Sequence, residues 1–248
     1  MKKLDIVYIC FAGYSHLDWG GTLETLKELK SRGNNVTILS GEPIKSYAKE
    51  HGLSFQDIGL SSFRPRIESE TIEDTLAYHQ FHNFFDVESI SDTFQRGMNY
   101  LNKHNIDVIL SDPLCKTGPL MSMKTGISYV VMGPYNYTPD LKVSEDNVQA
   151  LEQFLERFEE VTKKLGVKDG HKLPLVQNSP WLNIVFSTPD FDQELQEQNI
   201  VHVGSDILLK DKTFPISDKI KVFYSSGTIF WDAKQVEHGC FILEFKRK

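Results

Sequence analysis

The chain has 248 residues, of which 40% are hydrophobic and 25% are charged, a composition that excludes an intrinsically disordered, collagen-like or coiled-coil protein. Its 34 acidic residues outnumber its 27 basic ones and give a net charge of −7. Neither nucleic acid nor an anionic membrane surface is therefore expected as its main partner. No segment approaches the ~20 consecutive apolar residues of a membrane span.

The cysteines indicate a reducing compartment. Cys10, Cys115 and Cys240 are odd in number and lack C-x-x-C spacing, so neither a disulfide framework nor a zinc site is predicted. Asp5 interrupts the first apolar run, which is unlike a secretory signal, and we expect a cytoplasmic protein. Cys10 and Cys115 adjoin apolar strand ends and are expected to be small buried hydrophobic residues rather than nucleophiles.

The first sixty residues predict a β-α-β-α-β alternation. Residues 4–10 are a nearly continuous apolar run, typical of a strand in a parallel sheet that is covered on both faces. A polar, glycine-bearing loop over 12–21 follows, and then a helix with leucines at helical spacing that ends at Gly33. The next expected elements are a strand over 36–39, a helix over 44–52 and a strand over 55–58.

The same alternation continues after a long irregular segment, 59–87, which we interpret as a functional or mobile insertion. Its His79 and His82 lack a third ligand nearby, and no metal site is predicted. The helices expected beyond it cover about 90–104, 118–125 and 148–165, and the strands cover 107–110, 129–132, 183–187, 200–203 and 221–224.

Candidate catalytic residues follow the first and fourth strands. In a doubly wound sheet of order 3-2-1-4-5 these strands are neighbours, and their carboxyl ends meet where such sheets bind ligands. His16, with Ser15 and Asp18, lies in the loop after the first strand, and Asp112 follows Ser111 at the end of the fourth. A histidine oriented by an aspartate is a general base, so the spacing predicts a His16–Asp112 pair.

Other interpretations of these residues remain open. His16 could only cap a helix, and Asp112 before Pro113 could only shape a turn. The loop from Gly13 to Gly21 also invites a nicotinamide-binding interpretation, but it lacks the order G-x-G-x-x-G. Trp19, Tyr135 and Tyr137 adjoin the same sheet edge and are candidates for an acceptor pocket, although exposed turn residues would have the same pattern.

A series of segments resembles nucleotide-sugar-dependent glycosyltransferases of the macrolide and UDP-glycosyltransferase type, which have a GT-B fold of two Rossmann-like domains. The matching segments occur in the family's order and cover most of the chain: 11–16, 23–33, 36–39, 41–42, 107–113, 126–127, 187–192, 203–204 and 222–228. In one detail the sequence departs from the family, which usually has proline where Trp19 stands.

The resemblance implies an acceptor-binding, Rossmann-like domain over 1–208, a linker over 209–219 and an incomplete start of a donor domain over 220–248. It implies that His16 deprotonates the acceptor hydroxyl with Asp112 as its partner, in an inverting, metal-independent transfer of the hexosyltransferase class. Ser225, Gly227 and Thr228 match the loop that approaches the donor phosphates, and the co-substrate would be a UDP- or dTDP-sugar.

The sequence is therefore compatible with three functions. The first is a glycosyltransferase acting on a small, hydrophobic acceptor with its donor half supplied elsewhere. The second is a catalytically inactive acceptor-binding or accessory protein, favoured because nothing after Thr228 provides the rest of a donor site. The third is a nicotinamide-dependent oxidoreductase.

Overall fold

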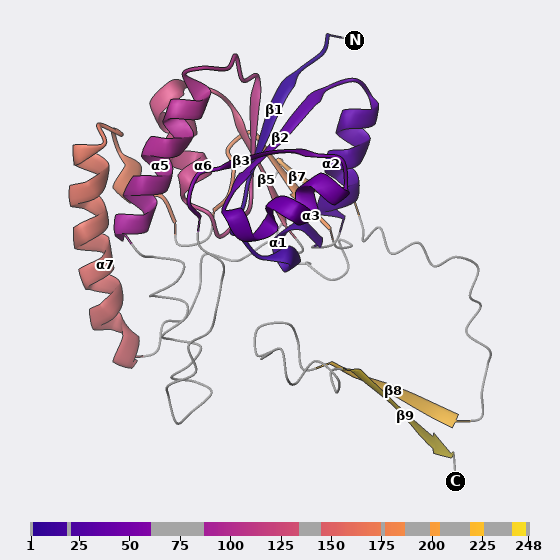
Figure 1. Cartoon of the computed structure of the whole chain (residues 1–248). Helices are drawn as coiled ribbons and strands as arrows, with labels where there is room; N and C mark the ends of the chain where they lie inside the picture. The colour runs from indigo at the N-terminus through magenta and orange to yellow at the C-terminus, as the bar shows by residue number, and fades with distance from the viewer. Residues whose placement is uncertain are drawn as a thin grey trace. The chain divides into compact units, whose positions relative to one another are not determined.

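The protein is described by a computed structural model in which the chain divides into two units (Figure 1). One unit comprises Met1–Arg64 and Glu68–Asp206, and the other comprises Pro65–Ile67 and Ile207–Lys248. The structure describes residues 2–18, 21–60, 87–133, 145–174, 177–186, 199–203, 219–225 and 240–246.

The larger unit is built on a seven-stranded parallel sheet of order β3-β2-β1-β4-β5-β6-β7. The continuous apolar run of the first strand places it at the centre, where both faces of the sheet are covered. The strands are β1 (Asp5–Ile9), β2 (Asn35–Ser40), β3 (Ser54–Asp57), β4 (Val108–Ser111), β5 (Tyr129–Gly133), β6 (Leu182–Val185) and β7 (Ile200–His202).

Helices cover both faces of this sheet, with α2 and α3 on one side and α5, α6 and α7 on the other (Figure 1). The change of side follows from right-handed crossovers, because the chain winds outward from β1 in opposite directions. The helices are α1 (Tyr14–Asp18), α2 (Thr22–Ser31), α3 (Lys45–Glu50), α5 (Val87–Leu101), α6 (Thr117–Thr125) and α7 (Glu145–Lys164), with short 3-10 turns η1 (Glu42–Ile44) and η2 (Gly170–Lys172).

Alternation along β1 divides the core into two layers. Val7 and Ile9 are fully buried under α5, α6 and α7, whereas Ile6 and Tyr8 face the α2 and α3 side. Successive side chains of a strand point to opposite faces, so one apolar strand contributes to both layers. The carboxyl end of β1 is therefore fixed from both sides.

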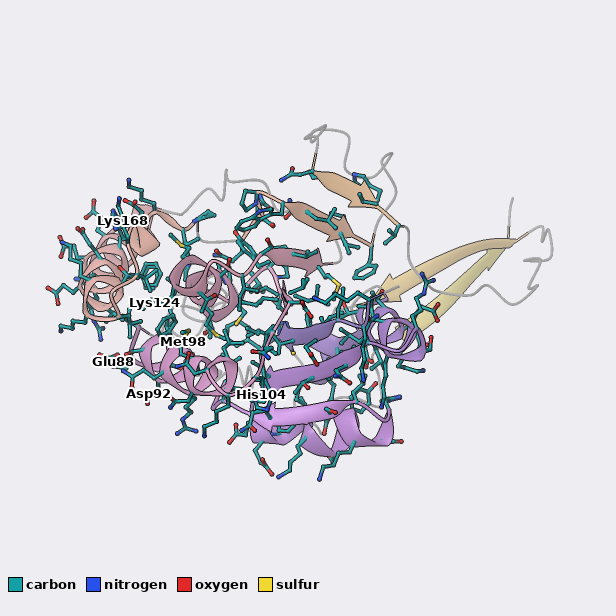
Figure 2. The ribbon with its side chains drawn as sticks, turned by 90° about the horizontal axis from the view of Figure 1, so that it is seen from above. Glu88, Asp92, Met98, His104, Lys124 and Lys168 are labelled. Carbon is teal, nitrogen blue, oxygen red and sulfur yellow. The ribbon has the colours of Figure 1, made fainter. Side chains whose placement is uncertain are left out.

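Polar side chains lie at the rim of the layer of α5, α6 and α7, among them Glu88 and Lys124 (Figure 2). The Lys124 ammonium of α6 donates to the carbonyls of Leu165 and Gly166 just beyond α7, at 3.1 and 3.0 Å. Arg157 of α7 pairs with Glu88 of α5. These contacts are exposed and each contributes little, so the apolar core holds the helices together.

The smaller unit contains a two-stranded antiparallel sheet of β8 (Lys219–Ser225) and β9 (Cys240–Lys246). The strand expected over 221–224 is thus present. Its partner, β9, comes from a tail in which the sequence analysis recognised no element. The assignment of this unit to the start of a donor domain stays a prediction.

The predicted fold class, a Rossmann-like doubly wound parallel sheet, is confirmed by the strand order. The expectation that 12–21 is only a loop was wrong, since residues Tyr14–Asp18 form the one-turn helix α1. Most of the 59–87 insertion, with His79 and His82, lies outside the described residues. None of the helices in the described ranges is both long and apolar enough to span a membrane.

Candidate functional site

The carboxyl ends of β1 and β4 lie side by side, because Ile9 pairs with Ser111 in the parallel ladder. The main-chain N–H of Asp112 continues this pairing by donating to the Ile9 carbonyl at 2.9 Å. The chain leaving β1 then turns into α1, where the His16 N–H donates to the Gly13 carbonyl at 3.1 Å. The two strand ends thus position the loops that carry the predicted pair.

His16 and Asp112 meet at this edge, although 96 positions separate them in the sequence. His16 Nδ1 lies 2.5 Å from Asp112 Oδ2. The histidine is 4% exposed and the aspartate 0%. Low solvent access strengthens a hydrogen bond of this kind, so Asp112 fixes the orientation of the imidazole.

Both partners are held by their surroundings. The second carboxylate oxygen of Asp112, Oδ1, accepts the main-chain N–H of Leu114 at 2.7 Å. The Tyr8 hydroxyl, buried under α1, donates to the His16 carbonyl at 2.9 Å. The ring of Phe11 lies against the imidazole, with ring centroids 5.6 Å apart. The pair is consequently held by main-chain groups and by side chains of the core.

The neighbouring thiols are not nucleophiles of this site. Cys10 and Cys115 are free and buried, as the sequence predicted. Burial, together with the Asp112 charge, raises the pKa of the Cys115 thiol to about 12 and raises that of Cys10 well above its ordinary value. Because the thiolate is the reactive form, both cysteines serve as packing residues here.

The other predicted site residues do not join the His16–Asp112 contact in the described part of the chain. Asp18 is exposed at the end of α1 and accepts a hydrogen bond from Tyr47 at 2.6 Å. The Ser111 hydroxyl is buried and directed at the carbonyls of Asp112 and Cys115, so it shapes the loop. Ser225 ends β8 in the smaller unit. The remaining candidates, Trp19, Tyr135, Tyr137, Gly227 and Thr228, lie outside the described residues.

Three residues have polar contacts that no sequence pattern predicted: Tyr8 beneath His16, Tyr47 against Asp18, and Lys116 against Pro174. Tyr8 lies within an apolar strand run and Tyr47 within a short helix, and neither pattern marks a polar role. Lys116 is 1% exposed, and its ammonium donates to the Pro174 carbonyl at 2.6 Å and lies over the rings of Phe154 and Phe158. A lysine four residues after Asp112 would ordinarily be placed at the surface.

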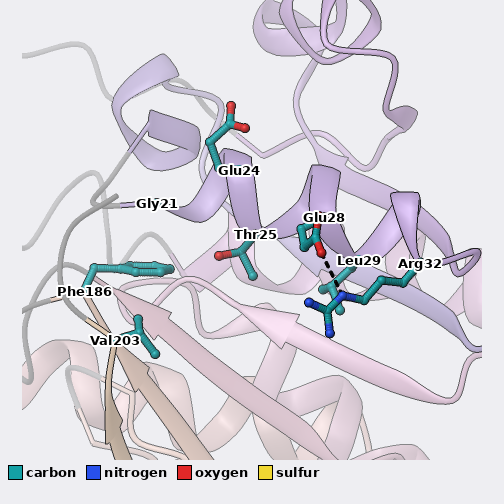
Figure 3. Close-up of a pocket in the computed structure, with 8 residues that line it drawn as sticks. All are labelled: Gly21, Glu24, Thr25, Glu28, Leu29, Arg32, Phe186 and Val203. Atoms are coloured by element: carbon teal, nitrogen blue, oxygen red, sulfur yellow. Dashed lines mark hydrogen bonds and ion pairs between the residues drawn. The ribbon is translucent and has the colours of Figure 1, made fainter. Parts of the chain in front are cut away.

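A separate cavity of about 420 Å³ lies along α2 (Figure 3). Its lining combines α2 side chains with Phe186 and Val203, which follow β6 and β7. Two of the lining residues are already paired, since Arg32 Nε lies 2.9 Å from Glu28 Oε1. Neither His16 nor Asp112 lines this cavity, so it is distinct from the candidate catalytic pair.

Comparison with known proteins shows the fold. No protein-family model matches the sequence, and no curated protein matches it significantly. Solved structures do match: a glycosyltransferase of kitacinnamycin has 19% identity and a TM-score of 0.59, covering 83% of this chain and 52% of the other. A calicheamicin glycosyltransferase has 16% identity and a TM-score of 0.59, covering 83% and 53%.

A third match is a Streptomyces sp. SF2575 glycosyltransferase complexed with thymidine diphosphate, with 15% identity and a TM-score of 0.54, covering 87% of this chain and 58% of the other. The chain thus spans about half the length of the structures that it matches. It has the fold of one half of these glycosyltransferases, in agreement with the resemblance found in the sequence.

Proposed function

We propose that this chain is the acceptor-binding half of a nucleotide-sugar-dependent glycosyltransferase, with His16 as the general base and Asp112 as its orienting partner. The observation that carries the proposal is the buried contact of 2.5 Å between His16 Nδ1 and Asp112 Oδ2 at the carboxyl edge of the sheet. This is the edge at which open α/β sheets bind their ligands. The shared fold with solved glycosyltransferases supports the same assignment.

In the proposed reaction, Asp112 holds the imidazole through Nδ1, and Nε2 takes the proton of the acceptor hydroxyl. The acceptor oxygen forms a bond to the anomeric carbon of the sugar while the bond from that carbon to the diphosphate breaks. The electron pair of the broken bond leaves with the nucleoside diphosphate, and the configuration inverts. Asp112 stabilises the imidazolium that forms, a contribution of about 10²- to 10⁴-fold in rate for such a base.

The donor is a nucleoside diphosphate sugar in this proposal, either a UDP- or a dTDP-sugar. The complex of one structural neighbour with thymidine diphosphate supports this donor class. Ser225, Gly227 and Thr228 are our candidates for contacts to its phosphates. Since the chain covers about half of the matched structures, we expect most stabilisation of the leaving diphosphate to come from residues outside it.

The acceptor is proposed to be small and hydrophobic, with Trp19, Tyr135 and Tyr137 lining its pocket. We also expect the protein to act in the cytoplasm, where the thiols of Cys10 and Cys115 stay reduced. The alternative of an inactive acceptor-binding protein shares this pocket and differs only in lacking turnover.

The test is a transfer assay with UDP- and dTDP-sugars, using the chain completed with the donor domain of a GT-B glycosyltransferase. We expect His16→Ala to lower kcat by about 10²- to 10⁴-fold. The matched control is His104→Ala, since His104 is exposed beyond the end of α5 and should leave kcat unchanged. Wild-type turnover in the His16→Ala variant would refute the base assignment. Acceptor binding by the wild type without any transfer would favour the accessory protein.

A further inference from the structure

The helix that carries His16 is too short to hold its own shape. α1 has five residues, Tyr14–Asp18, little more than one turn. Isolated helices shorter than about 12 residues are marginal in water, so α1 depends on contacts with the rest of the protein. The direction of the His16 imidazole therefore depends on whatever clamps α1.

The two faces of α1 have different partners. His16 points inward to Asp112, while Leu17 is fully buried against the α2 side of the core. Tyr14 and Asp18 are one turn apart and share the opposite, exposed face. Contacts made by Tyr14 and Asp18 thus bear on α1 from the side away from Asp112.

Tyr47 of α3 meets both outward residues. Its hydroxyl donates to Asp18 Oδ1 at 2.6 Å, and its ring meets the edge of the Tyr14 ring, with centroids 5.1 Å apart. Tyr47 also packs against His51, with ring centroids 4.5 Å apart. α3 itself is anchored, because Ile44 and Ala48 are fully buried in the core beneath it.

The Tyr47 hydroxyl remains a donor over the whole working range of pH. Burial raises the pKa of Tyr47 to about 12, and its hydrogen bond to Asp18 and the charges of Asp18, Glu50 and Glu24 act in the same direction. An acceptor that is ionised and a donor that stays protonated give a charge-assisted hydrogen bond. This contact joins two helices that are separate in the chain.

We propose that Tyr47 is a positioning residue, which clamps α1 from its outer face and so keeps the His16 imidazole on Asp112. Asp18 is its partner in this clamp, and Tyr14 supplies the packing surface. The consequence for catalysis rests on the function proposed above. The clamp on α1 can be tested without any measurement of sugar transfer.

The test is the exchange with water of the imidazole Nδ1 proton of His16, followed by NMR in the full chain. Tyr47→Phe keeps the ring contacts and removes the hydroxyl, and Asp18→Asn removes the charge of the acceptor. We expect each variant to accelerate this exchange by about 5-fold, and the double variant to be no faster than the single ones. The control is Tyr100→Phe. The Tyr100 hydroxyl, on α5, donates to Thr37 of β2 at 3.3 Å, so its removal should leave the exchange unchanged.

Hydrogen exchange of the main-chain amides of β1 distinguishes this positioning role from a general effect of Tyr47 on stability. If Tyr47→Phe only lowered overall stability, the amides of Val7 and Ile9 would exchange faster by the same factor, and that result would overturn the proposal. So would an unchanged His16 proton. Where transfer is measured, the clamp predicts a fall in kcat with the acceptor KM unchanged; without any transfer, the NMR result still decides the clamp.

Discussion

Asp112 is held in one orientation, and this gives a sharp expectation for its amide variant. Oδ1 accepts the Leu114 N–H, so an asparagine would keep its oxygen there and turn its NH₂ group toward His16 Nδ1. Nδ1 would then have to accept a hydrogen bond, and the proton would move to Nε2, the nitrogen that we propose as the base. Asp112→Asn should therefore lower kcat by about 10²-fold or more.

Steady-state kinetics of transfer check this expectation. The matched control is Asp107→Asn, which changes a carboxylate just before the amino end of β4, at the edge of the sheet away from the site. We expect kcat of Asp107→Asn to stay within about 2-fold of wild type. Wild-type kcat in Asp112→Asn would contradict the orienting role.

Lys116 provides a prediction about the pH dependence of stability. Burial lowers the pKa of its ammonium to about 7, whereas the unfolded chain has the ordinary value of 10.5. Between these values the unfolded state binds more protons than the folded state, so the free energy of unfolding rises with pH. The cost of the buried charge is fully present below pH 7 and is relieved toward pH 10.5.

Denaturant unfolding of the wild type and of Lys116→Met, measured from pH 6 to 10, isolates this effect. Methionine has a similar volume and does not titrate. We expect the free energy of unfolding of the wild type to rise, relative to that of the variant, by up to ~1.4 kcal/mol per pH unit above pH 7. Below pH 7 the difference between the two proteins should not change with pH. The nearby Cys115 thiol stays neutral over this range because its pKa is about 12. A difference independent of pH would refute the lowered pKa of Lys116.

At the scale of elements, the contact between α6 and β4 fixes the loop that carries Asp112. A Cβ atom at Gly118 would lie 2.5 Å from Ser111 Oγ and 2.9 Å from Ser111 Cβ. Neither atom can withdraw easily, since Ser111 is buried and its hydroxyl binds the loop carbonyls. Gly118→Ala should therefore lower the free energy of unfolding by about 1–3 kcal/mol.

The measurement is the denaturant midpoint at constant m-value. Met123→Ala, on the exposed side of the same helix, is the control and should change stability by no more than ~0.5 kcal/mol. Equal stabilities of Gly118→Ala and the wild type would show that α6 can move away from β4.

Elements with a strong local pattern were predicted, and those that depend on distant partners were not. The apolar run of β1 and the helical spacing of α2 and α7 are visible in consecutive residues, and the strand order was expected from the commonest order of doubly wound sheets. α1 has no such pattern, because its stability comes from Asp112 and from the Tyr8 and Tyr47 hydroxyls. β9 was missed for the same reason, since it exists by pairing with β8.

The same distinction applies to the site. The proximity of His16 and Asp112 followed from strand order, because both lie at the ends of neighbouring strands. The contacts of Tyr8 and Lys116 could not be inferred, since a tyrosine in a strand and a lysine near a helix start have no polar signature. Their roles arise only when the fold buries the Tyr8 hydroxyl beneath α1 and the Lys116 ammonium against α7.

At the scale of the whole molecule, the chain spans about half the length of the glycosyltransferases whose fold it shares. If the base and the acceptor pocket lie in this half, the diphosphate of the donor is held mainly by the other half of the enzyme. We therefore expect calorimetric titration of the chain with UDP- or dTDP-sugars to give a Kd weaker than about 1 mM, and acceptor binding to be retained. Micromolar binding of a nucleotide sugar would place the donor site within these 248 residues.

The most direct measurement of the central claim is a double-mutant cycle on kcat for His16→Ala and Asp112→Ala, in the chain completed with a donor domain. Residues that act as one catalytic unit have strongly non-additive effects. We predict that Asp112→Ala is severe in the wild type but lowers kcat by less than about 2-fold in the His16→Ala background. Two losses that simply multiply would mean that the buried pair is not the base of the reaction.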